Sequence, residues 1–281
     1  MIIKKNYDIS NVSFIKVGGI VNSYIVIEEV KELLSLKDDF IPISNTSKIL
    51  FAFDYLDTNV VKFNKSKIVF FKDSYFIYSG TSLSYCYEIL KEKGLSGFEY
   101  ISTIPGLLGG SIVNNASFLN EQISDNIIKV LIYHNNKFYF ISKKDCEFNY
   151  RSSNLKQNSL LVVGALFKNV YLSKEKLIKR HRYGVEYRKK YQGEFNKTLG
   201  STFKNKDDII VGKVLDELGY KGFTYSNNVK ISKNHANFIV VENKTNFLEI
   251  YTFIEFIKKL LYYYLGENIS LEINVITDGR N

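Results

Sequence analysis

Residues 94–125 read GLSGFEYISTIPGLLGGSIVNNASFLNEQISD, and this stretch carries the strongest signal for fold and function in the chain. The protein has 17 glycines and 2 prolines. Six of these fall within seventeen consecutive residues, namely Gly94, Gly97, Pro105, Gly106, Gly109 and Gly110. Glycine adopts positive φ and lets a ligand approach the backbone, and clustered backbone N–H groups bind anions such as a pyrophosphate. The spacing is neither a Rossmann fingerprint nor a P-loop, so a phosphate-binding turn and an ordinary compact loop both remain open.

Length and composition describe a globular protein. The 281 residues suggest two domains or three small ones, and 45% hydrophobic with 24% charged residues excludes disorder and collagen-like repetition. No apolar run is long enough for a membrane-spanning helix, and no apolar stretch follows the N-terminal lysines, so we expect neither membrane insertion nor a secretory signal. Cys86 and Cys146 alone cannot form a disulfide framework or a zinc site, and we expect two buried thiols in a cytosolic protein.

The net charge of +9 does not by itself indicate a nucleic-acid partner. The lysines are spread over the whole chain and accompany many Ile, Asn, Tyr and Phe residues, as an AT-rich genome would impose. The densest basic run, residues 174–190, alternates with apolar residues at helical spacing. A solvated helix face or a site for an acidic small molecule explains this run as well as DNA does. We therefore expect no nucleic-acid partner.

Hydrophobic periodicity predicts an α+β fold. Residues 1–171 alternate strand-like runs (24–27, 41–43, 67–72, 75–79 and 159–167) with helices over 28–36 and after Thr81 or Ser82. A hairpin is predicted at 127–141 around His134-Asn135-Asn136. Beyond residue 171 helical patterns dominate (173–191, 207–218 and 246–265), with strands at 236–241 and 269–276. Boundaries are predicted near residues 65 and 171.

Several strings together resemble one family. In chain order they are Val17-Gly18-Gly19, then Gly94-Leu-x-Gly-Phe-Glu with Ile104-Pro-Gly-x-x-Gly-Gly and Asn115-Ala116, then Tyr150-Arg-Ser-Ser, Gly200-Ser-Thr-Phe-Lys-Asn and Ser232-Lys-Asn-His-Ala-Asn-Phe. This order is similar to that of UDP-N-acetylenolpyruvoylglucosamine reductases, the MurB family of bacterial peptidoglycan synthesis. The short stretch between Phe203 and Gly219 resembles the shorter class, which lacks an inserted substrate-clamping loop.

The resemblance implies an architecture and an activity. It implies a two-part FAD-binding region, residues 1–65 and 66–171, and an α/β substrate-binding domain, residues 172–281, whose last strand returns to the active site. The implied enzyme is a cytoplasmic, monomeric flavoprotein oxidoreductase that uses FAD and NADPH to reduce UDP-N-acetylglucosamine enolpyruvate to UDP-N-acetylmuramate. Such an enzyme serves cell wall biogenesis, cell shape and cell division.

The resemblance also assigns roles to residues. Arg151 would hold the substrate carboxylate, since a guanidinium binds it bidentately, and Ser201 would donate the proton. The implied cofactor-binding residues are Asn45, Thr46, Ser47, Pro105, Gly106, Gly109, Gly110, Ser111, Asn115 and Ala116. The implied substrate-binding residues are Tyr150, Arg188, Lys189, Asn205 and His235. The three histidines are too scattered to suggest a metal.

The chain departs from the family strings at three places. Asn274 stands where the family has a Glu that assists protonation, and Glu272, about 6–7 Å away on the same face of a strand, is a possible substitute. The run 44–48, Ser-Asn-Thr-Ser-Lys, replaces Gly-x-Gly-Ser-Asn in the pyrophosphate loop, and Thr46 is expected to resist positive φ. Ser117 replaces a Gly. A working flavoenzyme and a catalytically impaired relative that binds FAD or a UDP-sugar both remain open.

Overall fold

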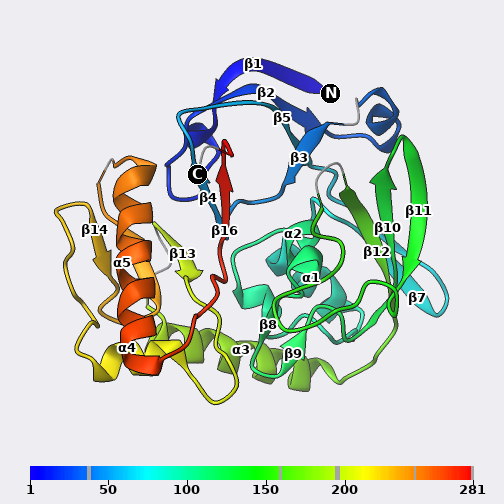
Figure 1. Ribbon diagram of the computed structural model, residues 1–281. Coiled ribbons are helices and arrows are strands. Elements are labelled where there is room, and N and C mark those ends of the chain that lie inside the picture. Colours follow the sequence, from blue (N-terminus) through cyan, green and yellow to red (C-terminus); the bar gives the residue numbers. More distant parts are fainter. Residues whose placement is uncertain (37–38, 158–159, 194–196, 244, 280–281) are drawn as a thin grey trace. The chain divides into compact units, whose positions relative to one another are not determined.

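The computed structural model describes residues 1–36, 39–157, 160–193, 197–243 and 245–279, and helices and strands mix along the chain (Figure 1). This confirms the α+β class. The strands are β1 (Ile2–Asp8), β2 (Ile20–Ile27), β3 (Phe40–Ile43), β4 (Ile49–Ala52), β5 (Tyr55–Phe63), β6 (Ile68–Phe70), β7 (Ser74–Tyr78), β8 (Ser117–Phe118), β9 (Glu121–Gln122), β10 (Ile127–His134), β11 (Lys137–Ser142), β12 (Leu161–Lys168), β13 (Thr198–Ser201), β14 (Val229–Ile231), β15 (Phe238–Val241) and β16 (Asn274–Thr277). The helices are α1 (Leu83–Glu92), α2 (Leu108–Val113), α3 (Lys174–Tyr191), α4 (Val211–Glu217) and α5 (Phe247–Leu265), with the 3₁₀ helices η1 (Ile9–Asn11), η2 (Val30–Ser35) and η3 (Ile101–Thr103).

The chain forms two compact units, each assembled from separate segments. Unit 1 comprises Met1–Lys5, Asn22–Asn45 and Thr58–Arg188, and unit 2 comprises Asn6–Val21, Thr46–Asp57 and Lys189–Asn281. Unit 2 has this composition because apolar side chains of its two early segments, such as Val17 and Leu50, are buried in one core with residues beyond 198. The predicted three-part division at residues 65 and 171 stays a prediction about which parts bind FAD and substrate.

Unit 1 contains a five-stranded antiparallel sheet in the order β11-β10-β12-β7-β6. The predicted hairpin is confirmed as β10–β11, with His134 paired to Lys137. Asn135 and Asn136 form its turn at φ 48° and 58°, and positive φ at both central residues is the type I′ geometry that suits twisted strands. The predicted strand over 159–167 is confirmed as β12, although its first residue lies outside the described residues.

Helix α1 begins where the sequence predicts, because the Ser82 hydroxyl accepts a hydrogen bond from the Tyr85 N–H at 3.2 Å. Its apolar face packs in one core with α2 and with β7, β10 and β12. Cys86 and Cys146 are free, buried thiols in that core, as predicted. Burial raises the pKa of the Cys146 thiol to about 11 and that of Cys86 further still, so neither is a ready thiolate at neutral pH.

Unit 2 contains the three-stranded sheet β13-β15-β14, and α5 runs beside it (Figure 1). The predicted helix over 246–265 is confirmed as α5. Asn246 caps it by accepting from the Glu249 N–H at 2.9 Å, and Gly266 ends it at φ 68°. Its buried residues are Ile250, Phe253, Ile254, Ile257 and Leu261. In the part of the chain that the structure describes, no helix has the length and apolar character needed to span a bilayer.

Three predicted elements differ from the structure. The helix predicted over 28–36 is the 3₁₀ helix η2. The helix predicted over 207–218 begins only at Val211, because the Asn205 side-chain carbonyl accepts from the Val211 N–H at 3.1 Å. The strand predicted over 269–276 is a regular strand only in β16, since the Glu272 N–H leaves the ladder and donates to the Thr202 carbonyl at 2.8 Å.

Candidate active site

The glycines of residues 106–110 allow close backbone packing in unit 1. A Cβ added to Gly109 would lie 2.8 Å from the Ser79 Cβ, and one added to Gly110 would lie 2.9 Å from the Ser44 Cβ. Neither position has room for a side chain. The contact between Gly110 and Ser44 also brings together two of the segments that the sequence predicts to bind the cofactor.

Gly106 differs, since an added Cβ would meet only the Ser111 hydroxyl at 3.5 Å and a Leu83 methyl at 3.9 Å. Gly106 and its neighbour Pro105 are half-buried, and this part of the backbone is not crowded by protein atoms. The Ser111 hydroxyl donates to the Leu107 carbonyl at 3.0 Å within the first turn of α2. The Gly106 backbone is therefore open on the side of a Cβ, while its carbonyl accepts from the Leu83 N–H at 3.2 Å and the Ser111 hydroxyl is engaged.

Asn115 lies at the turn after α2 with φ 42°, a left-handed conformation that asparagine tolerates. Its Nδ2 donates to the Gln122 side chain at 2.9 Å and to the Asn149 carbonyl at 3.0 Å. The Oδ1 atom is buried and has no hydrogen-bond partner among the described residues. Next to it, the Ala116 N–H donates to the Ser111 carbonyl at 2.8 Å. The turn thus presents one unused acceptor.

The expectation that Thr46 resists positive φ was wrong. Thr46 has φ 54° and is 3% exposed. Its hydroxyl accepts from the Phe14 N–H at 2.8 Å and donates to the Val12 carbonyl at 3.2 Å, and these bonds offset the cost of a left-handed β-branched residue. Asn45 ends a segment of unit 1, whereas Thr46 and Ser47 begin one of unit 2.

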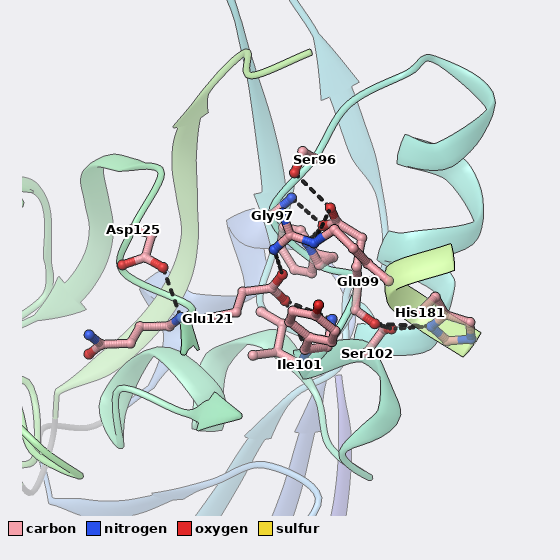
Figure 2. Close-up of polar contacts among 12 residues, drawn as sticks. Ser96, Gly97, Glu99, Ile101, Ser102, Glu121, Asp125 and His181 are labelled. Atoms are coloured by element: carbon pink, nitrogen blue, oxygen red, sulfur yellow. Dashed lines mark hydrogen bonds and ion pairs between the residues drawn. The ribbon is translucent and has the colours of Figure 1, made fainter. Parts of the chain in front are cut away.

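A buried carboxylate organises the start of the glycine-rich segment (Figure 2). Glu99, 1% exposed, accepts from the Ser96 hydroxyl at 2.7 Å and from the N–H groups of Gly97 and Phe98 at 2.6 and 2.9 Å. The carboxylate therefore closes the turn that carries Gly97.

Glu121, 4% exposed, is a second buried carboxylate in the same network (Figure 2). It accepts from the N–H groups of Tyr100 and Ile101 at 2.9 and 3.0 Å, where η3 begins. Burial raises the pKa of Glu121 to about 7, helped by the charge of Glu99 and opposed by those hydrogen bonds and by Arg180. Arg180 of α3 lies 3.4 Å from Glu99 and 3.3 Å from Glu121, so α3 is joined to the glycine-rich segment.

His181 anchors the end of that segment. Its Nδ1 lies 3.1 Å from the Ser102 hydroxyl and 3.1 Å from the Glu99 carbonyl (Figure 2), and its ring stacks on Tyr87 at 4.0 Å between centroids. These contacts give His181 a structural role. In the described ranges, no group of His, Cys, Asp and Glu side chains has the arrangement of a metal site.

Arg151 lies in a tight turn of unit 1, between β11 and β12, with φ 54°. Its Nη1 donates to the Ser117 hydroxyl at 2.6 Å and to the Ser117 carbonyl at 3.2 Å. The serine at which this chain departs from the family string therefore helps to hold the guanidinium. Tyr150, half exposed, lies beside it, with the Arg151 Cζ 5.4 Å from the ring centroid.

Arg188 and Lys189 occupy different faces of α3. Arg188 is 7% exposed, and its Cζ lies 5.5 Å from the Phe118 ring centroid. Burial lowers the pKa of Arg188 to about 10, which still leaves it charged at neutral pH. Lys189 is exposed. Only the lysine thus presents its side chain to solvent.

In unit 2, Ser201 ends β13 and is held by the neighbouring motif string. Buried Asn237 accepts from the Phe203 N–H at 3.0 Å through Oδ1 and donates to the Phe203 carbonyl at 2.8 Å through Nδ2. The Thr202 N–H donates to the Asn237 carbonyl at 2.8 Å. The strings Gly200-Ser-Thr-Phe and His235-Ala-Asn-Phe, which are far apart in sequence, thus meet at one side chain.

Lys48 and Glu272 lie beside Ser201. Lys48 Nζ donates to the Ser201 carbonyl at 2.8 Å and forms an ion pair with Glu272 Oε1 at 2.7 Å. Asn274 is a neighbour as well, because its N–H donates to the Lys48 carbonyl at 2.7 Å where β16 pairs in parallel with β4. Glu272, the possible substitute for the missing carboxylate, is therefore close to the backbone of the predicted proton donor.

The other two predicted residues of unit 2 have structural contacts. Asn205 is exposed and caps the start of α4. His235 accepts from the Asn237 N–H at 3.2 Å and stacks on Phe238 at 4.3 Å. Burial lowers the pKa of His235, with a smaller effect from the charges of Lys221 and Lys48, so the ring is neutral at pH 7.

Sequence reasoning did not select Asn237, Lys48 or Glu121 as site residues. Asn237 was inside a quoted string, so its position was available as a signal. Lys48 was noted only as the last residue of the changed run 44–48, because nothing local predicts its contact with a residue 153 positions later. Glu121 lies in the opening stretch, but its ion pair is with Arg180 of α3, a residue 59 positions later that the stretch itself does not reveal.

Comparisons with known proteins agree with these strings. The model of a family described as UDP-N-acetylenolpyruvoylglucosamine reductase, C-terminal domain, matches residues 191–276. The UDP-N-acetylenolpyruvoylglucosamine reductase of Caldanaerobacter subterraneus subsp. tengcongensis is 28% identical over 93% of this chain and 89% of its own. That of Aquifex aeolicus is 29% identical over 98% of this chain and 96% of its own.

A solved structure shares the fold. The crystal structure of UDP-N-acetylenolpyruvylglucosamine reductase (MurB) from Thermus caldophilus superposes with a TM-score of 0.86 at 23% identity, over 98% of this chain and 99% of that one. The similarity to the relatives extends through both units, and the family model covers the segment that carries Ser201 and Asn237. On this combined similarity, the chain resembles UDP-N-acetylenolpyruvoylglucosamine reductases (MurB) over nearly its whole length, and the C-terminal domain of that family matches residues 191–276.

Proposed function

We propose that this protein reduces the enolpyruvyl ether of UDP-N-acetylglucosamine enolpyruvate to UDP-N-acetylmuramate in peptidoglycan synthesis, with FAD as bound cofactor and NADPH as reductant. Similarity to these reductases over nearly the full chain supports this activity. The observation that carries it is the Gly200–Ser201 end of β13, which lies within the matched C-terminal segment and is held through the contacts of Asn237, Lys48 and Glu272. We place the enzyme in the cytoplasm as a monomer.

The residues of unit 1 fit a bound flavin nucleotide. Gly106 leaves backbone that protein atoms do not crowd, and the Asn115 Oδ1 is a buried acceptor without a partner among the described residues. A ligand that brings hydrogen-bond donors to this turn would satisfy that acceptor. We assign FAD to this surface and to the other predicted residues of unit 1, namely Asn45, Pro105, Gly109, Gly110, Ser111 and Ala116. Thr46 and Ser47, which follow Asn45 in the chain and begin a segment of unit 2, stay predicted FAD contacts.

FAD, when bound, would supply the two-electron chemistry between the nicotinamide and the substrate alkene. Ser201 would then protonate the alkene carbon that does not receive hydride. Arg151 would hold the substrate carboxylate, because its planar guanidinium is already oriented by Ser117 at 2.6 Å. The chain's own contribution is orientation, charge and one proton.

The UDP-sugar would contact several further residues. Lys189 is exposed on α3 and suits the diphosphate, while Arg188 would add positive charge from a buried position. Tyr150, next to Arg151, offers an exposed ring. Asn205 and His235 complete the set, although part of the hydrogen-bonding capacity of each is used within the protein.

The test is oxidation of NADPH by the purified protein with and without the enolpyruvyl substrate. Oxidation that depends on this substrate, with bound flavin seen by absorbance, supports the proposal. A protein that carries flavin and never oxidises NADPH in response to the substrate contradicts it. Replacing NADPH by NADH in the same assay decides the nicotinamide preference.

The second candidate is a catalytically impaired relative that keeps FAD or UDP-sugar binding. One observation favours it, namely that neutral Asn274 lies beside the Ser201 segment where the family strings have a carboxylate. Flavin retention with no turnover is the result that distinguishes this candidate.

A further inference from the structure

Lys48 joins the Ser201 end of β13 to a shielded carboxylate. Its ammonium donates to the Ser201 carbonyl at 2.8 Å and lies 2.7 Å from Glu272 Oε1. The Glu272 side chain is 6% exposed and that of Lys48 is 29% exposed, so the pair is screened less than a surface ion pair. The ammonium is thus fixed from two sides.

Gly200 provides the space for this ammonium. It has φ 71°, and an added Cβ would lie 3.2 Å from Lys48 Nζ and 3.6 Å from its Cε. Glycine here therefore both adopts the left-handed conformation and admits the lysine. The positive charge packs directly against the backbone that precedes Ser201.

Backbone hydrogen bonds from residues 272 and 274 fix the main chain at Lys48 and at Thr202. The Asn274 N–H donates to the Lys48 carbonyl at 2.7 Å, and the Glu272 N–H donates to the Thr202 carbonyl at 2.8 Å. Residues 272–274 thus hold Lys48 and the residue after Ser201 at once. Lys48 and Asn274 both depart from the family strings, and the structure makes these two departures direct neighbours.

We propose that Lys48 is a positioning residue for Ser201, held in place by Glu272, and that its charge stabilises the negative charge formed at Ser201. The inference rests on the proposed function, in which Ser201 protonates the substrate. In that step the Ser201 Oγ–H bond breaks and a C–H bond forms, using the electron pair that hydride addition leaves on the second carbon. The negative charge therefore moves from carbon to Ser201 Oγ.

A positive charge bound at the backbone carbonyl of Ser201 would favour negative charge on the Oγ of the same residue, and loss of one electrostatic stabilising group typically slows a reaction about 10²–10³-fold. Asn274 carries no charge and cannot make this contribution. Glu272 is paired with the ammonium and serves to hold it. The charge of Lys48, held by Glu272, thus stabilises the negative charge at Ser201, which the neutral Asn274 cannot do.

The test compares Lys48→Met, which keeps chain length without charge, with Lys48→Arg, which keeps the charge. Stopped-flow absorbance follows flavin reduction by NADPH and flavin reoxidation by the enolpyruvyl substrate separately. Lys48→Met should slow reoxidation about 10²-fold and change reduction and flavin content by less than about 2-fold. Lys48→Arg should recover reoxidation to within about 10-fold of the native rate.

Lys213→Met is the matched control, because Lys213 also belongs to unit 2 and pairs with a carboxylate but is largely exposed. It should leave both steps at native rates. A readout without substrate is thermal unfolding of Lys48→Met, Glu272→Gln and the double variant. If Lys48 and Glu272 stabilise the fold through their mutual ion pair, the Tm of the double variant should be little lower than that of the less stable single variant.

The outcomes separate two failures. A native protein without substrate-dependent reoxidation overturns the proposed function and this inference with it. The role of Lys48 alone is overturned if the native protein turns over and Lys48→Met reoxidises its flavin as fast as the native protein. It is also overturned if Lys48→Met slows flavin reduction and flavin reoxidation equally. If Lys48→Met does not fold, Glu272→Gln replaces it, and unchanged reoxidation in that variant overturns the inference.

Discussion

The Ser201 hydroxyl is the proton source in the proposed reaction, and removing it should separate the two half-reactions. Flavin reduction by NADPH needs no protein acid, so Ser201→Ala should leave it within about 2-fold of native. Reoxidation by the enolpyruvyl substrate should slow at least about 10²-fold, because general-acid catalysis contributes roughly 10²–10⁴-fold. Stopped-flow absorbance of the flavin measures both rates.

Ser84→Ala is the control for this variant, since Ser84 is an exposed serine on α1. It should change neither rate. If Ser201→Ala reduces the substrate as fast as the native protein, another group donates the proton. In that case Asn274→Glu, which restores a carboxylate at the position in the family strings, should show whether the native asparagine limits the step.

Thr46 stores conformational strain that its hydroxyl offsets. Thr46→Val keeps the β-branch and the left-handed φ of 54° but loses the bonds to Phe14 and Val12, so it should destabilise the fold by about 1–3 kcal/mol. Thr46→Gly loses the same bonds but relieves roughly 1–2 kcal/mol of left-handed strain, so it should be the less damaging change. Urea unfolding of the two variants measures the difference, and equal stability of valine and native protein would contradict this account.

The sequence selects single motif residues but does not reveal which residues contact them. Ser201 and Arg151 are selected from short strings, and their catalytic roles stay predictions. Lys48 was not, because its contact with Ser201 depends on two strands meeting across most of the chain. Thr46 shows a related limit, since its hydrogen bonds to residues 32 and 34 positions earlier override the φ preference of its type.

Among the elements, η3 and the turn before it depend on two buried carboxylates, and Glu121 makes their stability depend on pH. Its pKa is raised from 4.5 to about 7 in the folded protein, so the folded state binds the extra proton between these values. Stability should therefore fall as pH rises from about 4.5 to 7, by up to about 3 kcal/mol from this group.

Glu121→Gln removes this titration. The free energy of unfolding of this variant relative to native should rise by about 2–3 kcal/mol between pH 4.5 and pH 8, measured by urea unfolding at both pH values. Glu88→Gln is the control, because Glu88 is an exposed partner of Lys91 on α1, and its curve should run parallel to native. Parallel curves for Glu121→Gln as well would show that Glu121 is ionised in the folded protein throughout this range.

Elements with a strong local signal were predicted closely, whereas their ends depended on distant contacts. Asn246 and Gly266 bound α5 as expected, since a cap and a left-handed glycine act within a few residues. The start of β16 did not follow its apolar pattern, because backbone groups of residues 270–273 bond to residues 202–204 instead of continuing a ladder. Such competition cannot be read from the segment alone.

For the whole molecule, the composition of the two units predicts that a fragment of residues 1–171 does not fold. It lacks α3, which supplies buried Leu177 and the Arg180 link to Glu99. It also exposes Val17 and Leu50, which are buried in the core of unit 2. Circular dichroism should show no cooperative thermal transition for the fragment, in contrast to the full chain.

A cooperative transition near the Tm of the full chain would contradict this expectation and would favour the boundary at residue 171. The division at residue 171 was inferred because helical periodicity dominates the sequence beyond it, and the one at residue 65 was the weaker of the two. The two compact units have other boundaries, because apolar side chains from residues 6–21 and 46–57 share one core with residues beyond 189. The hydrophobic pattern of a short stretch of sequence does not reveal which distant segment packs against it in a core.

The same separated segments set a delay during synthesis on the ribosome. Val17 and Leu50 emerge early, yet the core that buries them includes Ile273. At roughly 5–20 residues per second, the ribosome needs about 10–45 s to make the residues between Leu50 and Ile273. For that time the core that buries Val17 and Leu50 is incomplete, and this interval is when chaperones and proteases have their best access to these side chains.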